Sequence, residues 1–382
     1  MKSLFPTLTL LVGTLALAAC GGGGGGGDAP APASPAPTPN PPVSNDPLGP
    51  VGTLSDEQDR LFVSVGMDVI QPGYESFKTG ASDLEAAATA YCADPAAGDL
   101  AAVQDAWRAA MLAWQSVSVV RFGPVEEDNR RLRIQFFPDA NDAVPNNVDQ
   151  LLNGTGALDV ASVAVSPVGA QGLPALEYLL FAVGGFDTVP RRCELAVAIA
   201  GNLVALATEL DDAWALDGQL LADFMGATGV YMDRQEVLTL ILESVALEAE
   251  FVADEKITTP IAVGAPGAES ARSEHSLENL IANIAALRAV LDNGTEDTDY
   301  GLRDYLSRAH AAESISDQLD GELSTAETGL AAIDASLEDI LLGTASGDID
   351  SVRVAMQDLA DLFIDSAVAA DVSLGFNNQD GD

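Results

Sequence analysis

Apolar side chains recur every three or four residues along most of this chain, which is the spacing of one face of an α-helix. Six stretches carry such a stripe, at 100–117, 195–214, 237–251, 277–291, 323–340 and 352–367. Charged residues such as Glu209 and Asp211 lie off the stripe, so each helix has a core-facing side. No run has the period-two alternation of a strand. The pattern predicts an all-α protein of packed helical bundles.

Turn-forming residues interrupt the stripes at 138–145, 184–190, 260–267 and 292–300. The break at 184–190 lies near the middle of the apolar part of the chain. It therefore predicts a boundary between two helical halves, residues 51–190 and residues 191–382. No clear sequence repeat relates the two halves.

The amino terminus has the pattern of a secretory signal. Lys2 precedes an apolar stretch at 4–17, and small residues then lead to Cys20 in the run Leu-Ala-Ala-Cys. This run resembles the lipobox of bacterial lipoproteins, which implies removal of residues 1–19 and lipid attachment to Cys20. The alternative is an ordinary signal peptide with a cysteine beside its cleavage site. The apolar stretch is too short and interrupted for a permanent transmembrane helix.

Residues 20–50 are predicted to be a flexible tether. Seven glycines at 21–27 are followed by a stretch in which proline alternates with small residues, and neither composition can bury a core. Gly21 stands where lipoproteins kept at the inner membrane of Gram-negative bacteria usually carry aspartate. We therefore expect a cell-envelope protein, attached to the outer membrane through the Cys20 lipid and facing the periplasm.

The charge balance limits the partners. The chain has 58 Asp and Glu against 17 Lys and Arg, a formal net charge of −41. Such a surface repels nucleic acid and anionic lipid head groups, so no nucleic-acid partner is expected. It suits cations or basic peptides, although the same charge can serve only solubility or adaptation to salt.

Two cysteines remain once Cys20 carries lipid. Cys92 ends an alanine-rich stretch and Cys193 opens a later helix. In an oxidising compartment two remaining cysteines are read as one disulfide, the alternative being two free buried thiols. Their spacing does not match a metal-binding motif.

Four segments together resemble the imelysin family, also classed as M75 peptidase-like. They are Ala113-Trp114 leading to the Arg-Phe-Gly-Pro turn at 121–124, Gly-Leu-Pro-Ala-Leu-Glu-Tyr-Leu-Leu-Phe at 172–181, Glu-Ser-Ala-Arg-Ser at 269–273 with Ser-Leu-Glu-Asn-Leu at 276–280, and Leu-Gly-Phe-Asn at 374–377. The resemblance runs from about residue 55 to the end. It implies two helical-bundle halves, with the hallmark motif near their interface, in an envelope protein often encoded with iron-uptake systems.

The chain differs from the family at one position of the hallmark motif. The family's hallmark Gly-x-His-x-x-Glu reads here with Pro174 in place of the histidine, so only Glu177 carries over as a metal ligand. Proline offers no lone pair and instead suits the first turn of a helix. The cofactor is therefore left open, with a divalent metal or iron as the candidates.

The resemblance and the residue chemistry together predict one ligand-binding site, with Glu177 at its centre. We expect Arg121 to orient Glu177 or to hold an anionic ligand group, since a guanidinium is no metal ligand. Ser270 and Ser273 are three residues apart and could share a helix face. The alternative is an interior salt bridge between the halves. The predicted site residues are Arg121, Glu177, Glu269, Ser270, Arg272 and Ser273.

Weaker metal candidates lie elsewhere. Each histidine has a glutamate three residues later, as His275 with Glu278 and His310 with Glu313, a spacing that abundant glutamate produces by chance. The acidic end at 380–382 has oxygen ligands suited to calcium but lacks the full loop spacing.

Three functions follow as hypotheses. The first is a non-catalytic lipoprotein that binds a small ligand, a metal or an envelope protein partner between its halves. The second is an M75-type metallopeptidase, against which the missing histidine argues. The third is a structural envelope protein that needs no ligand.

Replacing Cys20 by Ser should abolish lipid labelling and release the protein from the membrane fraction, because the thiol is the predicted attachment atom. Radiolabelled palmitate incorporation and cell fractionation measure both effects. A variant that stays in the membrane fraction would show that the lipobox interpretation is wrong.

Overall fold

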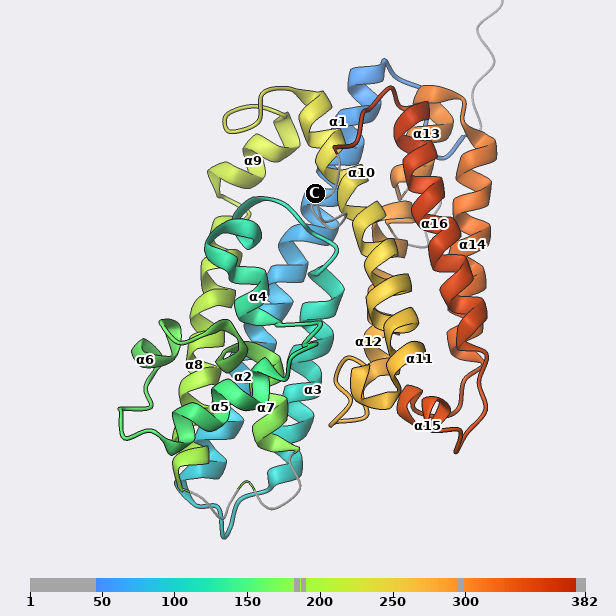
Figure 1. Ribbon diagram of the computed structural model, residues 1–382. Coiled ribbons are helices and arrows are strands. Elements are labelled where there is room, and N and C mark those ends of the chain that lie inside the picture. The colour runs from blue at the N-terminus through green and yellow to red at the C-terminus, as the bar shows by residue number, and fades with distance from the viewer. Residues whose placement is uncertain (1–45, 182–185, 187–189, 294–298, 376–382) are drawn as a thin grey trace, which may run out of the picture. The chain divides into compact units, whose positions relative to one another are not determined.

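The computed structural model describes residues 46–181, 186, 190–293 and 299–375 (Figure 1). Within these ranges the regular structure is helical throughout, without a strand. The all-α prediction is therefore confirmed. The signal, the Cys20 lipid site, most of the tether and the acidic end at 380–382 lie outside the described residues.

The helices differ in length and type. The α-helices are α1 (Leu54–Ser64), α2 (Gln71–Ala93), α3 (Leu100–Val117), α4 (Arg130–Ile134), α5 (Ala143–Asn153), α6 (Val160–Ala164), α7 (Gly172–Leu180), α8 (Pro190–Ala213), α9 (Gln219–Gly226), α10 (Arg234–Phe251), α11 (Thr259–Val263), α12 (Ser276–Asp292), α13 (Leu302–His310), α14 (Glu313–Ala331), α15 (Leu337–Leu341) and α16 (Ile349–Ala369). Two π-helical segments, η1 (Val65–Ile70) and η5 (Val252–Thr258), continue α1 and α10. Three short 3₁₀ segments are η2 (Gly123–Asn129), η3 (Val168–Ala170) and η6 (Ala265–Gly267).

The long helices pack in two groups (Figure 1). In the first, α2 lies against α3 and α8, and α7 packs on both α3 and α8. In the second, α16 lies between α14 and α10, and η5 also packs on α16. Helix α12 contacts α3 of the first group as well as α10 and α14 of the second. The α3–α12 contact is therefore where the two groups meet.

The predicted boundary between halves at residue 190 does not follow this packing. Helix α8 begins at Pro190, yet it lies against α2, α6 and α7 rather than against the later helices. Its stripe, which includes Leu195, Ile199 and Leu203, is buried. The helix that follows the turn-forming residues therefore packs in the first helix group. The turn-forming residues do not mark a boundary between the two groups.

Five of the six predicted helical stripes correspond to single helices, namely α3, α8, α10, α12 and α16. The sixth, at 323–340, is divided. Helix α14 ends at Ala331, and Ser336 caps the start of α15 by accepting a hydrogen bond from the Asp339 amide at 3.1 Å. The apolar spacing continues across the turn because Ile333 and Leu337 are both buried there. Periodicity alone could not reveal that interruption.

Within the described residues, one helix, Arg191–Ala213, is long and apolar enough to cross a membrane by length and composition. Its most apolar window is 56% buried inside the protein. Burial against α2 and α7 explains this composition as that of a core helix.

Cys92 and Cys193 lie side by side at the end of α2 and the start of α8. Their sulfurs are 2.13 Å apart and their Cα atoms 5.5 Å apart, which is the geometry of a disulfide. The bond would close a loop across 101 positions of sequence and fasten the two antiparallel helices at one end.

Reduction of this pair should destabilise the fold. A loop of that length is worth about 4–5 kcal/mol in the chain-entropy description, with measured values often lower. Urea unfolding with and without reductant measures the difference, and Cys92→Ala should show the same loss. Two titratable thiols in the unreduced, denatured chain carrying Cys20→Ser would contradict the pairing.

Candidate functional site

A cavity of about 370 Å³ lies beside the start of α7. It is bounded by the extended segment after α4, by α11 and η6, and by the turn at 268–272. Four of the six predicted site residues line it, namely Glu177, Glu269, Ser270 and Arg272. The remaining wall is largely apolar or aromatic, and includes Met111, Phe136, Phe137, Pro138, Val144, Pro174, Val263 and Pro266.

The start of α7 is fixed by a close backbone approach at Gly172. This residue has φ of +69°, and a Cβ there would collide with the carbonyl oxygens of Arg133 and Ile134. Only glycine fits, which gives the first position of the hallmark motif a physical reason. Pro174 lies in the first helical turn as predicted, where its missing N–H is no loss.

Glu177 is buried one turn further on, with 3% of its surface exposed. Its Oε1 accepts hydrogen bonds from the amides of Arg272 and Ser273, at 3.0 and 2.9 Å, and from the Ser273 hydroxyl at 2.9 Å. Among the described residues no donor bonds to Oε2, so one oxygen is fully used and the other is not. The predicted association of Glu177 with Arg272 and Ser273 is thus present as backbone and hydroxyl contacts.

Burial raises the pKa of Glu177 above its ordinary value. The Ser273 and Arg272 donors and the Arg272 charge act in the opposite direction but are outweighed. A carboxyl group of this kind binds a proton, or a positively charged ligand group, more readily than a carboxyl in water.

Glu269, the second buried carboxylate, is held entirely by protein groups. Its Oε1 accepts from Gln135 at 2.6 Å, and its Oε2 accepts from Asn279 at 2.8 Å. The Lys256 ammonium approaches its Oε1 to 2.9 Å, with side-chain exposures of only 2% and 4%. Both oxygens are therefore saturated, and Glu269 is better described as an anchor of the cavity wall than as a free ligand.

Lys256 also donates to two side chains of neighbouring helices. Its ammonium lies 2.8 Å from Gln115 Oε1 on α3 and 2.7 Å from Asn283 Oδ1 on α12. Asn283 in turn donates to Gln115 Oε1 at 2.9 Å. We call these five residues, Gln115, Lys256, Glu269, Asn279 and Asn283, the interior network. It joins the two helix groups where α3 and α12 meet.

The interior network was missed from the sequence, although a signal exists. Gln115, Asn279 and Asn283 sit within apolar helical stretches and are fully buried. A polar residue on a core-facing stripe needs partners, so three of them predict a shared hydrogen-bonded cluster. The burial of Lys256 has no such signal in the sequence. Lys256 lies in the π-helical segment η5, where the residue spacing of an α-helix does not predict which side chains face the core.

The predicted pairing of Arg121 with Glu177 is wrong. The Arg121 guanidinium instead donates through Nε and Nη2 to Glu248 Oε2, at 3.1 and 2.7 Å, and lies over the Phe251 ring at 4.9 Å. Burial alone would raise the pKa of Glu248, but the charges of Arg121, Lys256 and Arg131 together lower it. Arg121 is thus an interior ion pair to α10, and it does not line the cavity.

Ser270 and Ser273 do not share a helix face, because residues 269–274 form turns and α12 begins only at Ser276. Ser270 has φ of +57°, and the Ser273 amide donates to its carbonyl at 3.2 Å. The Ser270 hydroxyl accepts from Asn279 at 3.0 Å, whereas the Ser273 hydroxyl donates to Glu177. The turn, not a helix, brings the donors to Glu177.

The residues present do not fit a metal ion. In the described part of the chain no group of three or more His, Cys, Asp or Glu side chains converges as metal ligands. Pro174 replaces the family's histidine, and Glu269 has no free oxygen. His275 is instead 3.5 Å from Glu278 with its Nε2 buried and unpartnered, and His310 bonds to the Tyr305 hydroxyl at 2.9 Å.

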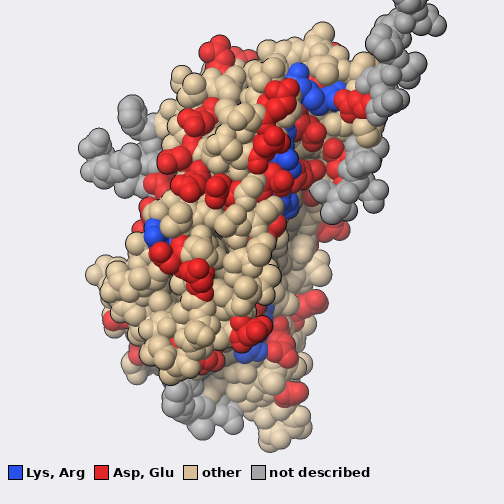
Figure 2. All heavy atoms as spheres, turned by 90° about the vertical axis from the view of Figure 1, so that its right-hand side faces the viewer, with Lys and Arg blue, Asp and Glu red and all other residues tan. Residues whose placement is uncertain are grey.

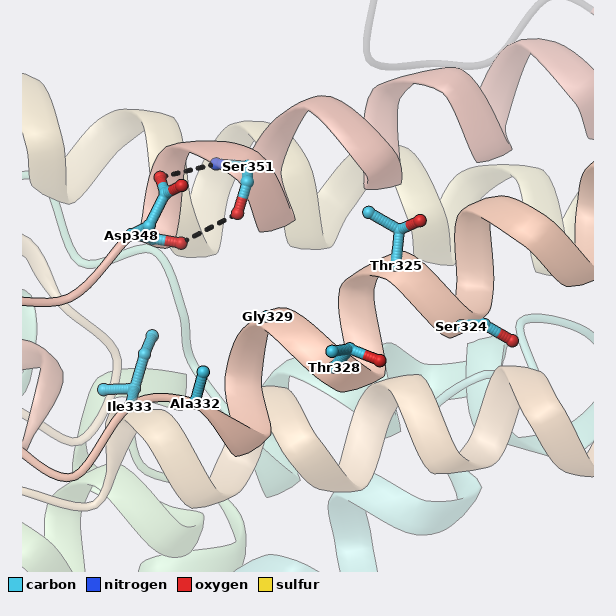
Figure 3. Close-up of a pocket in the computed structure, with 8 residues that line it drawn as sticks. All are labelled: Ser324, Thr325, Thr328, Gly329, Ala332, Ile333, Asp348 and Ser351. Atoms are coloured by element: carbon cyan, nitrogen blue, oxygen red, sulfur yellow. Dashed lines mark hydrogen bonds between the residues drawn. The ribbon is translucent and has the colours of Figure 1, made fainter.

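A larger depression of about 520 Å³ lies between α14 and α16 (Figure 3). Hydroxyl and small side chains such as Thr325, Thr328 and Ala332 line it. Its one carboxylate, Asp348, already caps α16 by accepting from the Ser351 amide at 3.1 Å. It has no buried charged group to recognise a ligand, so the cavity at Glu177 is the stronger candidate.

Comparisons with known proteins agree with this architecture. A family model described as imelysin, of the M75 peptidase group, matches residues 70–365. The chain is 28% identical over 279 residues to iron-regulated protein A of Synechococcus elongatus, which covers 71% of this chain and 74% of that protein. The fold is similar to the crystal structure of an imelysin-like protein from Psychrobacter arcticum, with a TM-score of 0.69, 19% identity, and coverage of 86% of this chain and 99% of that one.

Replacing Glu177 by Gln tests how the buried carboxyl is held. An amide oxygen keeps the acceptor that the three donors need, while the neutral amide avoids the cost of burying a charged carboxylate, which raises the pKa of Glu177. The pKa of Glu177 is higher in the folded chain than in the unfolded chain. The stability that this carboxyl contributes is therefore complete below its ordinary pKa of 4.5 and is lost as pH rises through the folded-state pKa. The melting temperature of Glu177→Gln should therefore gain on that of wild type as pH rises above 4.5.

Glu177→Ala is the matched control. It leaves buried donors without an acceptor, at about 1–3 kcal/mol for each unsatisfied group, and should melt lower at every pH. If Gln and Ala lower the melting temperature equally at alkaline pH, the three bonds to Oε1 do not hold Glu177.

Proposed function

Because this chain belongs to the imelysin family, we propose that it is an envelope-associated, non-catalytic protein that binds a small ligand in the cavity at Glu177. The ligand presents a cationic or hydrogen-bond-donating group to the carboxyl. Attachment to the outer membrane through the Cys20 lipid is part of the proposal and rests on the signal sequence.

The observation that carries the proposal is the unequal use of the two Glu177 oxygens. Three donors orient the carboxyl through Oε1, while Oε2 receives no hydrogen bond from the described residues. Glu177 lines the cavity although it is 3% exposed. Oε2 is not among the buried side-chain atoms that lack a partner, and Glu177 lines the cavity, so a ligand in the cavity can reach this oxygen. Because the rest of Glu177 is shielded from water, a hydrogen bond or charge contact from the ligand is stronger here than at the surface.

The cavity wall narrows the class of ligand. Phe136, Phe137 and three prolines give it apolar and aromatic character, which suits the carbon skeleton of an organic molecule. Arg272 is exposed at the rim, with its guanidinium 5.3 Å from the centre of the Tyr178 ring. A compact aromatic or aliphatic amine therefore matches the site better than a bare metal ion.

Peptidase activity receives less support from the same residues. A metallopeptidase needs metal ligands around an open coordination position. Here Pro174 has no ligand atom, and Lys256, Gln135 and Asn279 occupy both oxygens of Glu269.

An iron complex is a second candidate ligand. The observation that favours it is the similarity to the Synechococcus protein, whose name describes it as iron-regulated.

Calorimetric titration with benzylamine tests the proposal, because its ring suits the apolar wall and its ammonium suits Glu177. The protein is the chain from residue 20 with Cys20→Ser, and benzyl alcohol is the uncharged control. We expect wild type to bind benzylamine, and Glu177→Gln to bind it at least about tenfold more weakly. Affinity should also fall as pH drops through the raised pKa of Glu177, because protonation removes the charge.

Ferric citrate is titrated in parallel to distinguish the second candidate. Binding of ferric citrate that Glu177→Gln abolishes, with no binding of benzylamine, would favour the iron complex. Equal binding of benzylamine to both proteins, or none to either, would contradict the proposed amine-binding site.

A further inference from the structure

A groove of about 710 Å³ runs between α10 with η5 on one side and α16 on the other. Its apolar lining comes from Ala246, Leu247, Ala253, Ala360, Ile364 and Leu374. Ile364 of α16 lines the groove and is 50% exposed. The groove is separate from the Glu177 cavity, and the two have no lining residue in common.

Carboxylates line both sides of the apolar strip. Glu243, Glu250 and Asp254 come from the α10 side, and Asp358 and Asp361 from α16. No Lys, Arg or His is among the described residues that line the groove. Glu243 and Glu250 are seven residues apart, which places them on one face of α10 two turns from each other.

Burial raises the pKa of Glu243, which disfavours its charged form until a cation lies beside it. The nearest basic residue along α16, Arg353, pairs with Asp350 at 2.7 Å and bonds to Gln357. On the face that carries α13, α14 and α16, carboxylates far outnumber basic side chains (Figure 2).

We propose that this groove docks a basic amphipathic helix of another envelope protein. An apolar strip between two acidic edges complements a helix with an apolar stripe flanked by Lys and Arg. A second copy of this chain is a poor occupant, because its own net charge is −41. From Glu243 to Asp254 the α10 edge spans about 16 Å, so it matches a partner segment of about three turns.

Fluorescence anisotropy with a labelled designed peptide tests the proposal. The peptide has about 14 residues, with leucine along one helical face and lysine on both flanks. A scrambled peptide of equal composition has no such stripe. The protein is again the chain from residue 20 with Cys20→Ser, which keeps the compact unit at 45–382 intact.

The groove variant Glu243→Gln/Asp361→Asn should bind the designed peptide roughly tenfold more weakly than wild type. The control Asp83→Asn/Asp317→Asn removes the same charge from exposed sites on α2 and α14, and its affinity should stay within about twofold of wild type. Ile364→Ser should weaken binding without any change of charge. Circular dichroism confirms that each variant is folded.

Hydrogen exchange locates the bound peptide. The designed peptide should slow exchange in the α16 segment at 357–364. The proposal is overturned if wild type shows no saturable binding, if the scrambled peptide binds as tightly, or if both charge variants weaken binding equally. Equal weakening would mean attraction to the net charge of the whole chain rather than to the groove.

Discussion

The ion pair between Lys256 and Glu269 is the contact on which the rest of the arrangement depends. Both side chains are almost fully buried, and their atoms approach to 2.9 Å. Removing two charges from water costs several kcal/mol for each, so the pair persists only because Gln115, Gln135, Asn279 and Asn283 complete its hydrogen bonds. These partners come from both helix groups. The interior network thus selects one way of packing the groups rather than merely adding stability.

The interior network fixes the geometry of the cavity at Glu177. Glu269 begins the turn whose next residues, Arg272 and Ser273, present their amides to Glu177. Fixing Glu269 therefore fixes the donors that orient the second carboxyl. With Pro174 in the first turn of α7, the same scaffold no longer offers a histidine next to Glu177. What remains is an oriented carboxyl in an apolar cavity, which favours an organic cation over a metal ion.

The all-α fold could be predicted from the sequence, because a helix that packs on a core carries apolar residues every three or four positions. The site was only partly predictable. Glu177, Glu269, Ser270 and Arg272 came from motif resemblance and do line one cavity.

Arg121 was assigned to the wrong carboxylate because Glu177 and Glu248 are equally plausible partners until the tertiary contacts are known. Lys256 could not be foreseen, since a lone lysine in a helix is normally solvated and a π-helical segment turned it inward. The packing of α8 against α2 is a long-range contact, which the turn-forming residues before Pro190 could not reveal.

A double-mutant cycle on the central pair tests this account most directly. Urea unfolding is measured for wild type, Lys256→Met, Glu269→Gln and the double variant. Either single change should cost about 3–5 kcal/mol, because it leaves a buried charge without its partner. The double variant should be less destabilised than the sum of the two, with a coupling of about 1–3 kcal/mol. Additive losses, or single losses below about 1 kcal/mol, would contradict the central role of the pair.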